Sequence, residues 1–359
     1  MKGEAVYFFA FDIANELLPD QAIKLLGERV TRYVLRSKHA APQQVTYYRP
    51  LSVAPPPLNI EIAGRPLRVE TRLYEVGVVS ILMRLEFEAA AIGELRGLHH
   101  PTLPDNRTLS ELARELCATL RQEIESALVR HSPLSEPEAY TAFCLYDLGP
   151  ATDAERWVTE QRVGVAGLLA DVPADRLAES QVEEACRQRR SWEKSDAVVI
   201  HWEAALVIEL GGQADDVLFT LELANLQLEE FRRLDAALDN VLNQAYLDLE
   251  RRSIALFGIS TAVLRKLRWF RVDHTKLADE VINITKFFGD WHLARVYFAA
   301  RERFHLDQWR SSVDQRLAQL DQLYNVFHTE LTERRMFWVE MVVVALIALD
   351  LLALMLRSH

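Results

Sequence analysis

Residues 336–356 limit most strongly how this chain can fold, because they form its longest apolar stretch, MFWVEMVVVALIALDLLALML. A helix needs about 20 apolar residues to cross a bilayer, so the stretch predicts one C-terminal transmembrane helix. Glu340 and Asp350 oppose insertion. A central Asp costs about 2.5–3.5 kcal/mol, whereas each Leu, Ile, Val or Phe contributes about 0.3–0.6 kcal/mol in favour. The sum favours a span over the alternative, a buried helix of a soluble protein.

The residues that flank this stretch predict its orientation. Arg334 and Arg335 precede it, and positively charged flanks favour the cytoplasmic side. The N-terminus has only a short apolar run between Glu4 and Asp12, which differs from a signal peptide. We therefore expect a single-pass C-terminal anchor in the inner (cytoplasmic) membrane, with the N-terminal domain in the cytoplasm.

The composition excludes several classes of function. The 359 residues are enough for two domains, and the net charge of −11 makes nucleic acid an unlikely partner. The three cysteines, Cys117, Cys144 and Cys186, have no CxxC spacing, which suits a reducing compartment. The sequence contains no GxxxxGK[ST], GxGxxG or GxSxG motif, so we expect no cofactor and no enzymatic activity.

Residues 1–211 predict an α+β domain with a mixed, mostly antiparallel sheet. Strands are predicted over 5–13, 58–63, 67–74, 76–87, 139–148, 196–200 and 203–210, and helices from Pro19, from Thr108 and over 153–169. Thr108 or Ser110 can cap the second of these helices, with Glu111 at capping-box spacing if Thr108 is the cap, and Asp153 can cap the third. Frequent polar residues in 67–74 predict a solvent-exposed face on that strand. The order of elements is compatible with a ferredoxin-like split β-α-β core.

Residues 212–335 predict a helical, coiled-coil stalk. No proline follows residue 214, and glycine occurs there only at 258 and 289. Apolar residues spaced alternately by four and three form a heptad seam: Val313, Leu317, Leu320, Tyr324, Phe327 and Leu331. No helix breaker separates this stalk from residues 336–356, so we expect one long helix that continues into the membrane.

The C-terminal part resembles the required-for-meiotic-nuclear-division family. The resemblance rests on NITKFF and GDWHLARVY within residues 283–297, RLAQLDQLY from 316, ELTERR from 330 and WVEMVVV from 338. It implies a membrane-anchored, self-associating protein with no assigned enzymatic activity, in a family whose mitochondrial members support organellar translation. The N-terminus lacks an Arg- and Ser-rich transit peptide, so a bacterial inner-membrane protein fits better.

Glu340 and Asp350 are the leading candidate site residues, since ionisable groups in a membrane span usually face a bundle interior or a water-filled cavity. The alternative is that Glu340 reaches the interface and Asp350 is protonated. Weaker candidates for metal ligands are His201 with Glu203, His99-His100, and Asp290 with His292, because no third ligand stands at a defined spacing. The basic clusters over 187–190 and 265–271 fit a solvated helix face better than an anionic partner.

These features predict a non-enzymatic, homo-oligomeric, membrane-anchored scaffold. The C-terminal helix would associate with copies of itself, and the α+β head would present a surface to an unidentified protein partner, for which the resemblance implies a link to translation. The alternative function is a homo-oligomeric ion channel or transporter of CorA-like layout, with a pore lined by Glu340 and Asp350.

Overall fold

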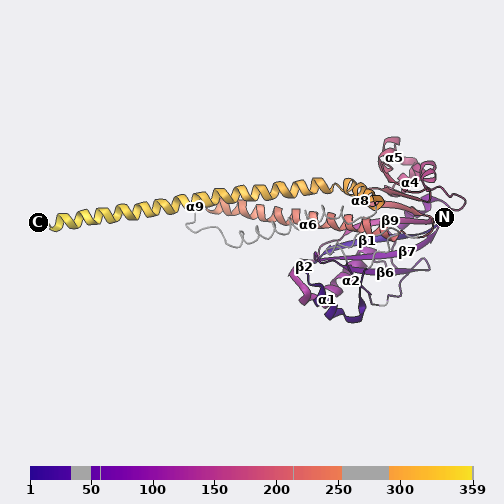
Figure 1. Ribbon diagram of the computed structural model, residues 1–359, viewed down its shortest axis with the longest axis horizontal. Coiled ribbons are helices and arrows are strands. Elements are labelled where there is room, and N and C mark those ends of the chain that lie inside the picture. Colours follow the sequence, from indigo (N-terminus) through magenta and orange to yellow (C-terminus); the bar gives the residue numbers. More distant parts are fainter. Residues whose placement is uncertain (34–49, 57, 213, 253–290, 358–359) are drawn as a thin grey trace. The chain divides into compact units, whose positions relative to one another are not determined.

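The computed structural model describes residues 1–33, 50–56, 58–212, 214–252 and 291–357 (Figure 1). The chain divides into two compact units. The first contains residues 1–233 and the described part of 277–310, and the second contains the described parts of 234–276 and 311–359. The α+β class predicted from the sequence is confirmed for the first unit, which is built on a large mixed sheet.

Ten strands of the described chain form this sheet, in the order β10-β11-β12-β9-β1-β7-β6-β4-β3, with β5 paired to β6. Their bounds are β1 Lys2–Asp12, β3 Val30–Arg32, β4 Leu51–Val53, β5 Glu61–Ile62, β6 Arg65–Leu73, β7 Val78–Glu88, β9 Glu138–Asp147, β10 Gln188–Arg190, β11 Asp196–Ile200 and β12 Ala204–Glu209. All pairs are antiparallel except β9 with β12. A separate pair joins β2 (Ala14–Leu17) to β8 (Leu128–His131).

The four central strands have the order β9-β1-β7-β6 with every pair antiparallel. Helix α1 (Pro19–Leu26) follows β1, and α2 (Leu109–Glu123) connects β7 to β9. This is the arrangement of a split β-α-β core, as the sequence suggested. The strands β4 and β3 extend the core on one side, and β12, β11 and β10 extend it on the other.

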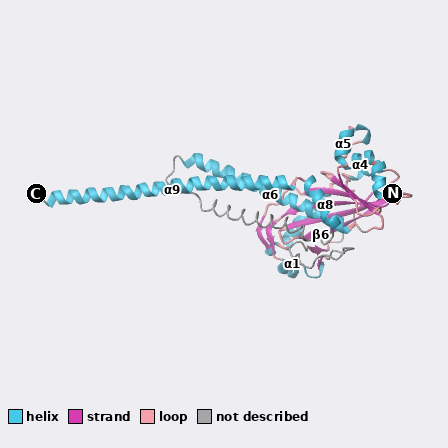
Figure 2. Ribbon diagram, turned by 45° about the horizontal axis from the view of Figure 1, so that its top comes forward, coloured by secondary structure: helices cyan, strands magenta, loops and turns pink. Residues whose placement is uncertain are grey.

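Helices cover both faces of the sheet, which explains why β1 is buried along almost its whole length (Figures 1 and 2). Because side chains alternate across a strand, Ala5, Tyr7, Phe9 and Phe11 enter one large core with α1 and α2. The same core takes in α3 (Ala154–Glu160) and α4 (Arg162–Leu169). A small cluster joins α4 to α5 (Glu179–Ala185). Short 3₁₀ turns lie at Gly27–Arg29, Ile92–Leu98, Glu125–Ala127 and Ala174–Arg176.

The opposite face of the sheet packs against α6 (Asp215–Arg252) and α8 (Trp291–Arg303). Every residue of α6 from 217 to 229 is buried, including the polar Thr220, Asn225 and Gln227. The Tyr297 hydroxyl of α8 donates to Gln227 Oε1 at 2.5 Å. A helix buried all round is unusual for a sequence with this many polar side chains, so its polar groups need partners within the fold.

In the second unit, the end of α6 runs parallel to α9 (Leu306–Arg357). Ser312 donates to Asp235 at 2.9 Å, and Arg316 forms an ion pair with Asp239, so both contacts join positions 77 residues apart. Arg316 Nε also lies 2.7 Å from Asp235. A constant offset between two helices is the sign of parallel pairing in one register, and in that register Arg252, the end of α6, lies level with position 329.

The predicted transmembrane helix is wrong. No helix in the described part of the chain is long and apolar enough to cross a bilayer. Residues 336–356 belong to the end of α9, and the two acids leave an uninterrupted apolar run only from 341 to 349, well short of the roughly 20 residues required. The predicted inner-membrane localisation, the C-terminal anchor and the orientation of the N-terminal domain depended on that span and are withdrawn with it.

We expect Thr108→Ala to lower the free energy of unfolding by about 1 kcal/mol, because the capping box at the start of α2 is formed. Thr108 Oγ1 accepts from the Glu111 amide at 3.2 Å, and the Thr108 amide donates to Glu111 Oε2 at 2.7 Å. Thr119→Ala, in the middle of the same helix, is the matched control and should be close to neutral. Urea unfolding measures both, and equal effects would contradict the capping role.

Candidate functional site

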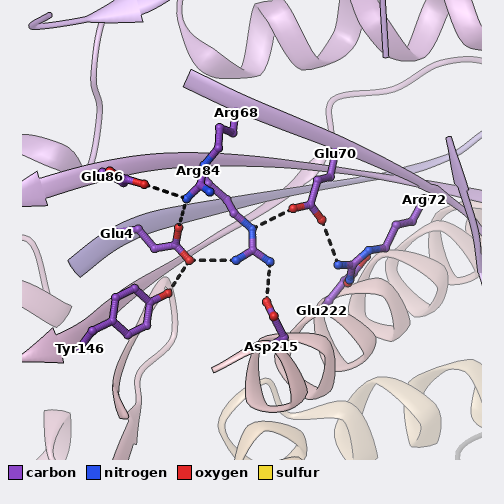
Figure 3. Close-up of polar contacts among 9 residues, drawn as sticks. All are labelled: Glu4, Arg68, Glu70, Arg72, Arg84, Glu86, Tyr146, Asp215 and Glu222. Atoms are coloured by element: carbon purple, nitrogen blue, oxygen red, sulfur yellow. Dashed lines mark hydrogen bonds and ion pairs between the residues drawn. The ribbon is translucent and has the colours of Figure 1, made fainter. Parts of the chain in front are cut away.

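A network of nine polar and charged side chains lies between the sheet and the start of α6 (Figure 3). Its members come from one face of four strands and from one helix: Glu4 of β1; Arg68, Glu70 and Arg72 of β6; Arg84 and Glu86 of β7; Tyr146 of β9; and Asp215 and Glu222 of α6. The register places Arg68 directly opposite Arg84, so these two cations need acidic neighbours to lie side by side.

Arg84 is the centre of the network. Its guanidinium lies 2.8 Å from Glu4, 2.9 Å from Asp215 and 3.1 Å from Glu70, using all three of its nitrogens. Glu4, which is buried, also meets Arg68 at 2.8 Å and accepts from the Tyr146 hydroxyl at 2.5 Å. These contacts join β1, β6, β7 and β9 to the first turn of α6.

Arg72 and Glu222 form the most deeply buried pair, with side chains 3% and 1% exposed. Arg72 also contacts Glu70 at 3.2 Å, and its guanidinium lies 4.2 Å from the centre of the Tyr33 ring. Burial is the largest single effect and opposes the charge on Arg72, but Glu222, Tyr74, Tyr33 and Glu70 together outweigh it, so the pKa of Arg72 is raised. Burial, with Glu222 beside it, also raises the pKa of the Tyr74 hydroxyl.

This arrangement has the chemistry of a clamp. Each of the four carboxylates Glu4, Glu70, Asp215 and Glu222 meets at least one guanidinium. Burial raises the pKa of Tyr33 to about 12 and raises that of Tyr146 as well, so both hydroxyls stay protonated at neutral pH. Neutral hydroxyls and paired charges can hold strands and helices in position. A general acid or base, in contrast, needs a pKa near the working pH.

A second polar cluster lies further along α6, where Glu229 is buried near Glu138 of β9. Arg232 forms an ion pair with Glu138, and its guanidinium lies 5.7 Å from the Trp309 ring centre. Burial, and then Glu138, raises the pKa of Glu229 to about 7, against the opposing effect of Arg232. Glu229 therefore changes charge near neutral pH.

The structure describes the side chains of half of the predicted seam. Val313, Leu317 and Leu320 are buried, in the stretch of α9 that pairs with the end of α6. Tyr324, Phe327 and Leu331 lie in α9, but their side chains fall outside the described residues. The first half of the seam is thus used within one chain.

Of the two acids in the apolar stretch, Glu340 is exposed on α9. The side chain of Asp350 lies outside the described residues. Around Glu340, large apolar side chains stand in solvent, from 49% exposed at Met341 to 64% at Val339. They are Met336, Phe337, Val339, Met341, Val342, Val343, Val344, Leu346 and Ile347.

The candidate metal ligands do not come together. Among the described residues, no group of three or more His, Cys, Asp and Glu side chains could hold a metal ion. His99 Nε2 lies 2.6 Å from the carbonyl oxygen of Leu168, and burial lowers the pKa of His201 to about 4. His292 lies 4.0 Å from Asp196. Asp290 and the basic cluster over 265–271 lie outside the described residues, and the cluster over 187–190 lies at the edge strand β10.

An α+β domain joined to long helices, with its leading helix clamped to the sheet by buried charges, defines the class of protein. The chain belongs to the family described as "Uncharacterized protein MJ0711, N-terminal domain", which matches residues 2–215. A similar protein, described as "Uncharacterized protein MJ0711" of Methanocaldococcus jannaschii, is 21% identical over 247 residues, or 69% of this chain and 74% of that protein.

The resemblance to the required-for-meiotic-nuclear-division family is wrong, because the matching family is a different one and covers the first 215 residues. The motifs behind that resemblance lay in residues 283–344, and heptad patterns such as the one that starts at Val313 produce similar sequences without common descent. The inferences taken from it, a link to translation and a bacterial inner membrane, lose their basis.

We expect Arg72→Met to destabilise the fold by about 3–5 kcal/mol, because it leaves the Glu222 carboxylate buried without its cation. The double variant Arg72→Met/Glu222→Met should recover most of this loss, since well-packed apolar side chains can replace a buried ion pair. Arg156→Met, which breaks the exposed pair with Glu160, should cost less than about 0.5 kcal/mol. Denaturant unfolding of the wild type, Arg72→Met, Glu222→Met and the double variant gives the coupling free energy, and simple additivity at 72 and 222 would contradict the clamp.

We expect the free energy of unfolding to fall as the pH rises from about 4.5 to about 7, because Glu229 has a higher pKa in the folded protein than its ordinary value. The folded state binds the proton more tightly, so its advantage is full at low pH and is lost as Glu229 ionises, by on the order of 3 kcal/mol. Glu229→Gln should remove this part of the pH dependence, while the exposed Glu28→Gln should not. Urea unfolding at pH 5 and pH 8 compares them, and an unchanged slope in Glu229→Gln would overturn the assignment.

Proposed function

We propose that this protein is a non-enzymatic, homo-oligomeric scaffold whose copies associate through the end of α9. The supporting observation is the set of nine large apolar side chains that stand about half exposed between Met336 and Ile347. The α+β domain of each copy then presents its surface to a protein partner. This proposal keeps the self-association expected from the sequence and drops the membrane anchor.

The exposed end of α9 is costly for a chain that remains alone in water. Full burial of a Val, Leu, Ile, Phe or Met side chain contributes about 1.5–3 kcal/mol of stabilisation. Burying the exposed halves of nine such side chains would therefore contribute on the order of 10 kcal/mol. A helix that is apolar all round is normally buried. Monomeric proteins rarely expose a continuous apolar patch of more than a few hundred Å², which supports an interface at this segment.

A second copy of the chain is the partner that this surface fits best. The described part of α6 ends level with position 329 in the register set by Ser312 and Arg316, which is short of the exposed segment. The same segment on another copy offers an equal apolar surface, and closed symmetric dimers are the commonest protein oligomers. Apolar attraction has to exceed the repulsion between chains of net charge −11, which a patch of this size can do.

The alternative function, an ion channel lined by Glu340 and Asp350, depended on a membrane span and loses its basis with it. The non-enzymatic part of the proposal is supported by the chemistry of the ionic network, whose carboxylates are paired and whose tyrosine hydroxyls have raised pKa values. Such groups hold α6 on the sheet.

Sedimentation equilibrium of the full chain should give a mass that is at least twice 41.1 kDa and a whole multiple of it. Val343→Lys/Ile347→Lys places two charges on one stripe of the exposed segment and should weaken association at least a hundredfold, since four apolar sites are lost per dimer. The matched control is Leu25→Lys/Val163→Lys, which has the same net charge and replaces exposed apolar residues of the α+β domain. A wild-type monomer at all concentrations, or an equal loss of association in the control, would contradict the proposal.

Glu340→Gln should strengthen self-association by about two- to fivefold, because it removes a charge from the apolar segment while keeping its size. The expected change corresponds to about 0.5–1 kcal/mol, the range for interactions between exposed charges. The exposed Glu302→Gln is the control for the loss of one acid elsewhere in the chain. Analytical ultracentrifugation over a concentration series measures both, and weaker association in Glu340→Gln would show that Glu340 contributes an attractive contact.

A further inference from the structure

A pocket of about 460 Å³ lies beside the edge strand β10, and none of its lining residues belongs to the ionic network. Its walls come from α3, α4, α5 and β10, all within the first unit. The lining residues are Glu155, Thr159, Arg162, Val182, Glu183, Cys186, Arg187 and Arg189. The volume falls within the range of about 300–1,000 Å³ that is typical of small-molecule sites.

Three guanidinium groups line this pocket, and two of them are weakly compensated. Arg187 lies 3.5 Å from Glu184, but Glu184 is held chiefly by Arg303, which is the largest cause of its lowered pKa. Arg189 lies 3.7 Å from Glu155, beyond hydrogen-bonding distance. The third, Arg162, is paired with Glu179 at 2.5 Å.

The orientation of Arg189 is fixed by the protein itself. Its Nη1 donates to Thr159 Oγ1 at 2.9 Å, and the Thr159 hydroxyl donates in turn to the Glu155 carbonyl oxygen at 2.9 Å. A guanidinium has five N–H donors, so this contact leaves most of them available. A held guanidinium with spare donors is suited to bidentate recognition of an oxyanion.

We propose that this pocket binds a small molecule that carries a phosphate monoester and hydroxyl groups. The phosphate accepts hydrogen bonds from Arg187 and Arg189, which offer a fork geometry that matches its oxygens. The pocket is much larger than a phosphate ion, so an organic group also fits. Val182 offers that group an apolar contact, and the carboxylates of Glu155 and Glu183 can accept from its hydroxyls.

Cys186 supplies a built-in probe of occupancy. It lines the pocket, whereas Cys117 and Cys144 are both fully buried, and the chain has three cysteines in all. A neutral alkylating reagent such as iodoacetamide should therefore label Cys186 alone in the folded protein. Burial raises the pKa of the Cys186 thiol, so the reaction is run at pH 8.5, where the thiolate fraction is larger.

The test measures the rate of Cys186 alkylation in the full chain, at constant ionic strength, with ribose 5-phosphate, inorganic phosphate or ribose. We expect ribose 5-phosphate to slow alkylation at least threefold at saturation, inorganic phosphate to do so at higher concentration, and ribose to have no effect. Arg187→Gln/Arg189→Gln should abolish the protection. The matched control, Arg156→Gln/Arg176→Gln, removes the same charge from exposed positions outside the pocket and should keep it.

Mass spectrometry separates a binding defect from a folding defect, because a folded variant takes up one label and an unfolded one takes up three. The proposal is overturned if ribose protects as well as ribose 5-phosphate, if no phosphate compound protects the wild type, or if protection persists in a folded Arg187→Gln/Arg189→Gln variant. Self-association through α9 is scored separately by sedimentation, so the failure of one proposal leaves the other testable.

Discussion

The packing of α6 on the sheet depends on charges buried between them. Arg72 and Glu222 are almost wholly removed from water, and Arg84 connects three carboxylates from two strands and the helix. Removing charges from water is expensive, and the cost is offset only when every partner is present in good geometry. The network therefore fixes one register of α6 against β6 and β7, whereas an apolar contact would tolerate sliding.

The same network explains where sequence patterns succeed and where they fail. Alternating and continuous apolar runs correctly predicted β1, β7, β9, β11 and β12, and capping residues correctly placed the starts of α2 and α3. The pattern in residues 67–74 was interpreted as a solvent-exposed strand face, yet Arg72 is 3% exposed. A hydrophobicity pattern equates polar with solvated, and it cannot show that Glu222, some 150 positions away, will supply the compensating charge.

The candidate sites show the same limit of sequence patterns, which do not reveal contacts between distant residues. The pocket beside β10 includes three arginines, and the sequence revealed only the basic run over 187–190, which was assigned to a solvated face. Arg162 and Thr159 come from helices that the sequence predicted as one, over 153–169, whereas α3 ends at Glu160 and α4 begins at Arg162. That break and the short α5, which no strong periodicity marks, build most of the pocket walls. Local periodicity carries no information on such packing.

The long helix α9 uses its apolar residues in two different ways, and this division supports self-association through its end. Val313, Leu317 and Leu320 have the spacing of an oligomeric coiled coil, but they are buried in the stretch where α9 is joined to α6 of the same chain. Heptad residues that are already buried within one chain give that chain no reason to oligomerise. The exposed residues from Met336 to Ile347 lie beyond the level of Arg252. They surround the helix on all sides, which is the pattern of a helix that other helices enclose. The driving force for the proposed assembly is therefore concentrated in the part of α9 beyond the described end of α6.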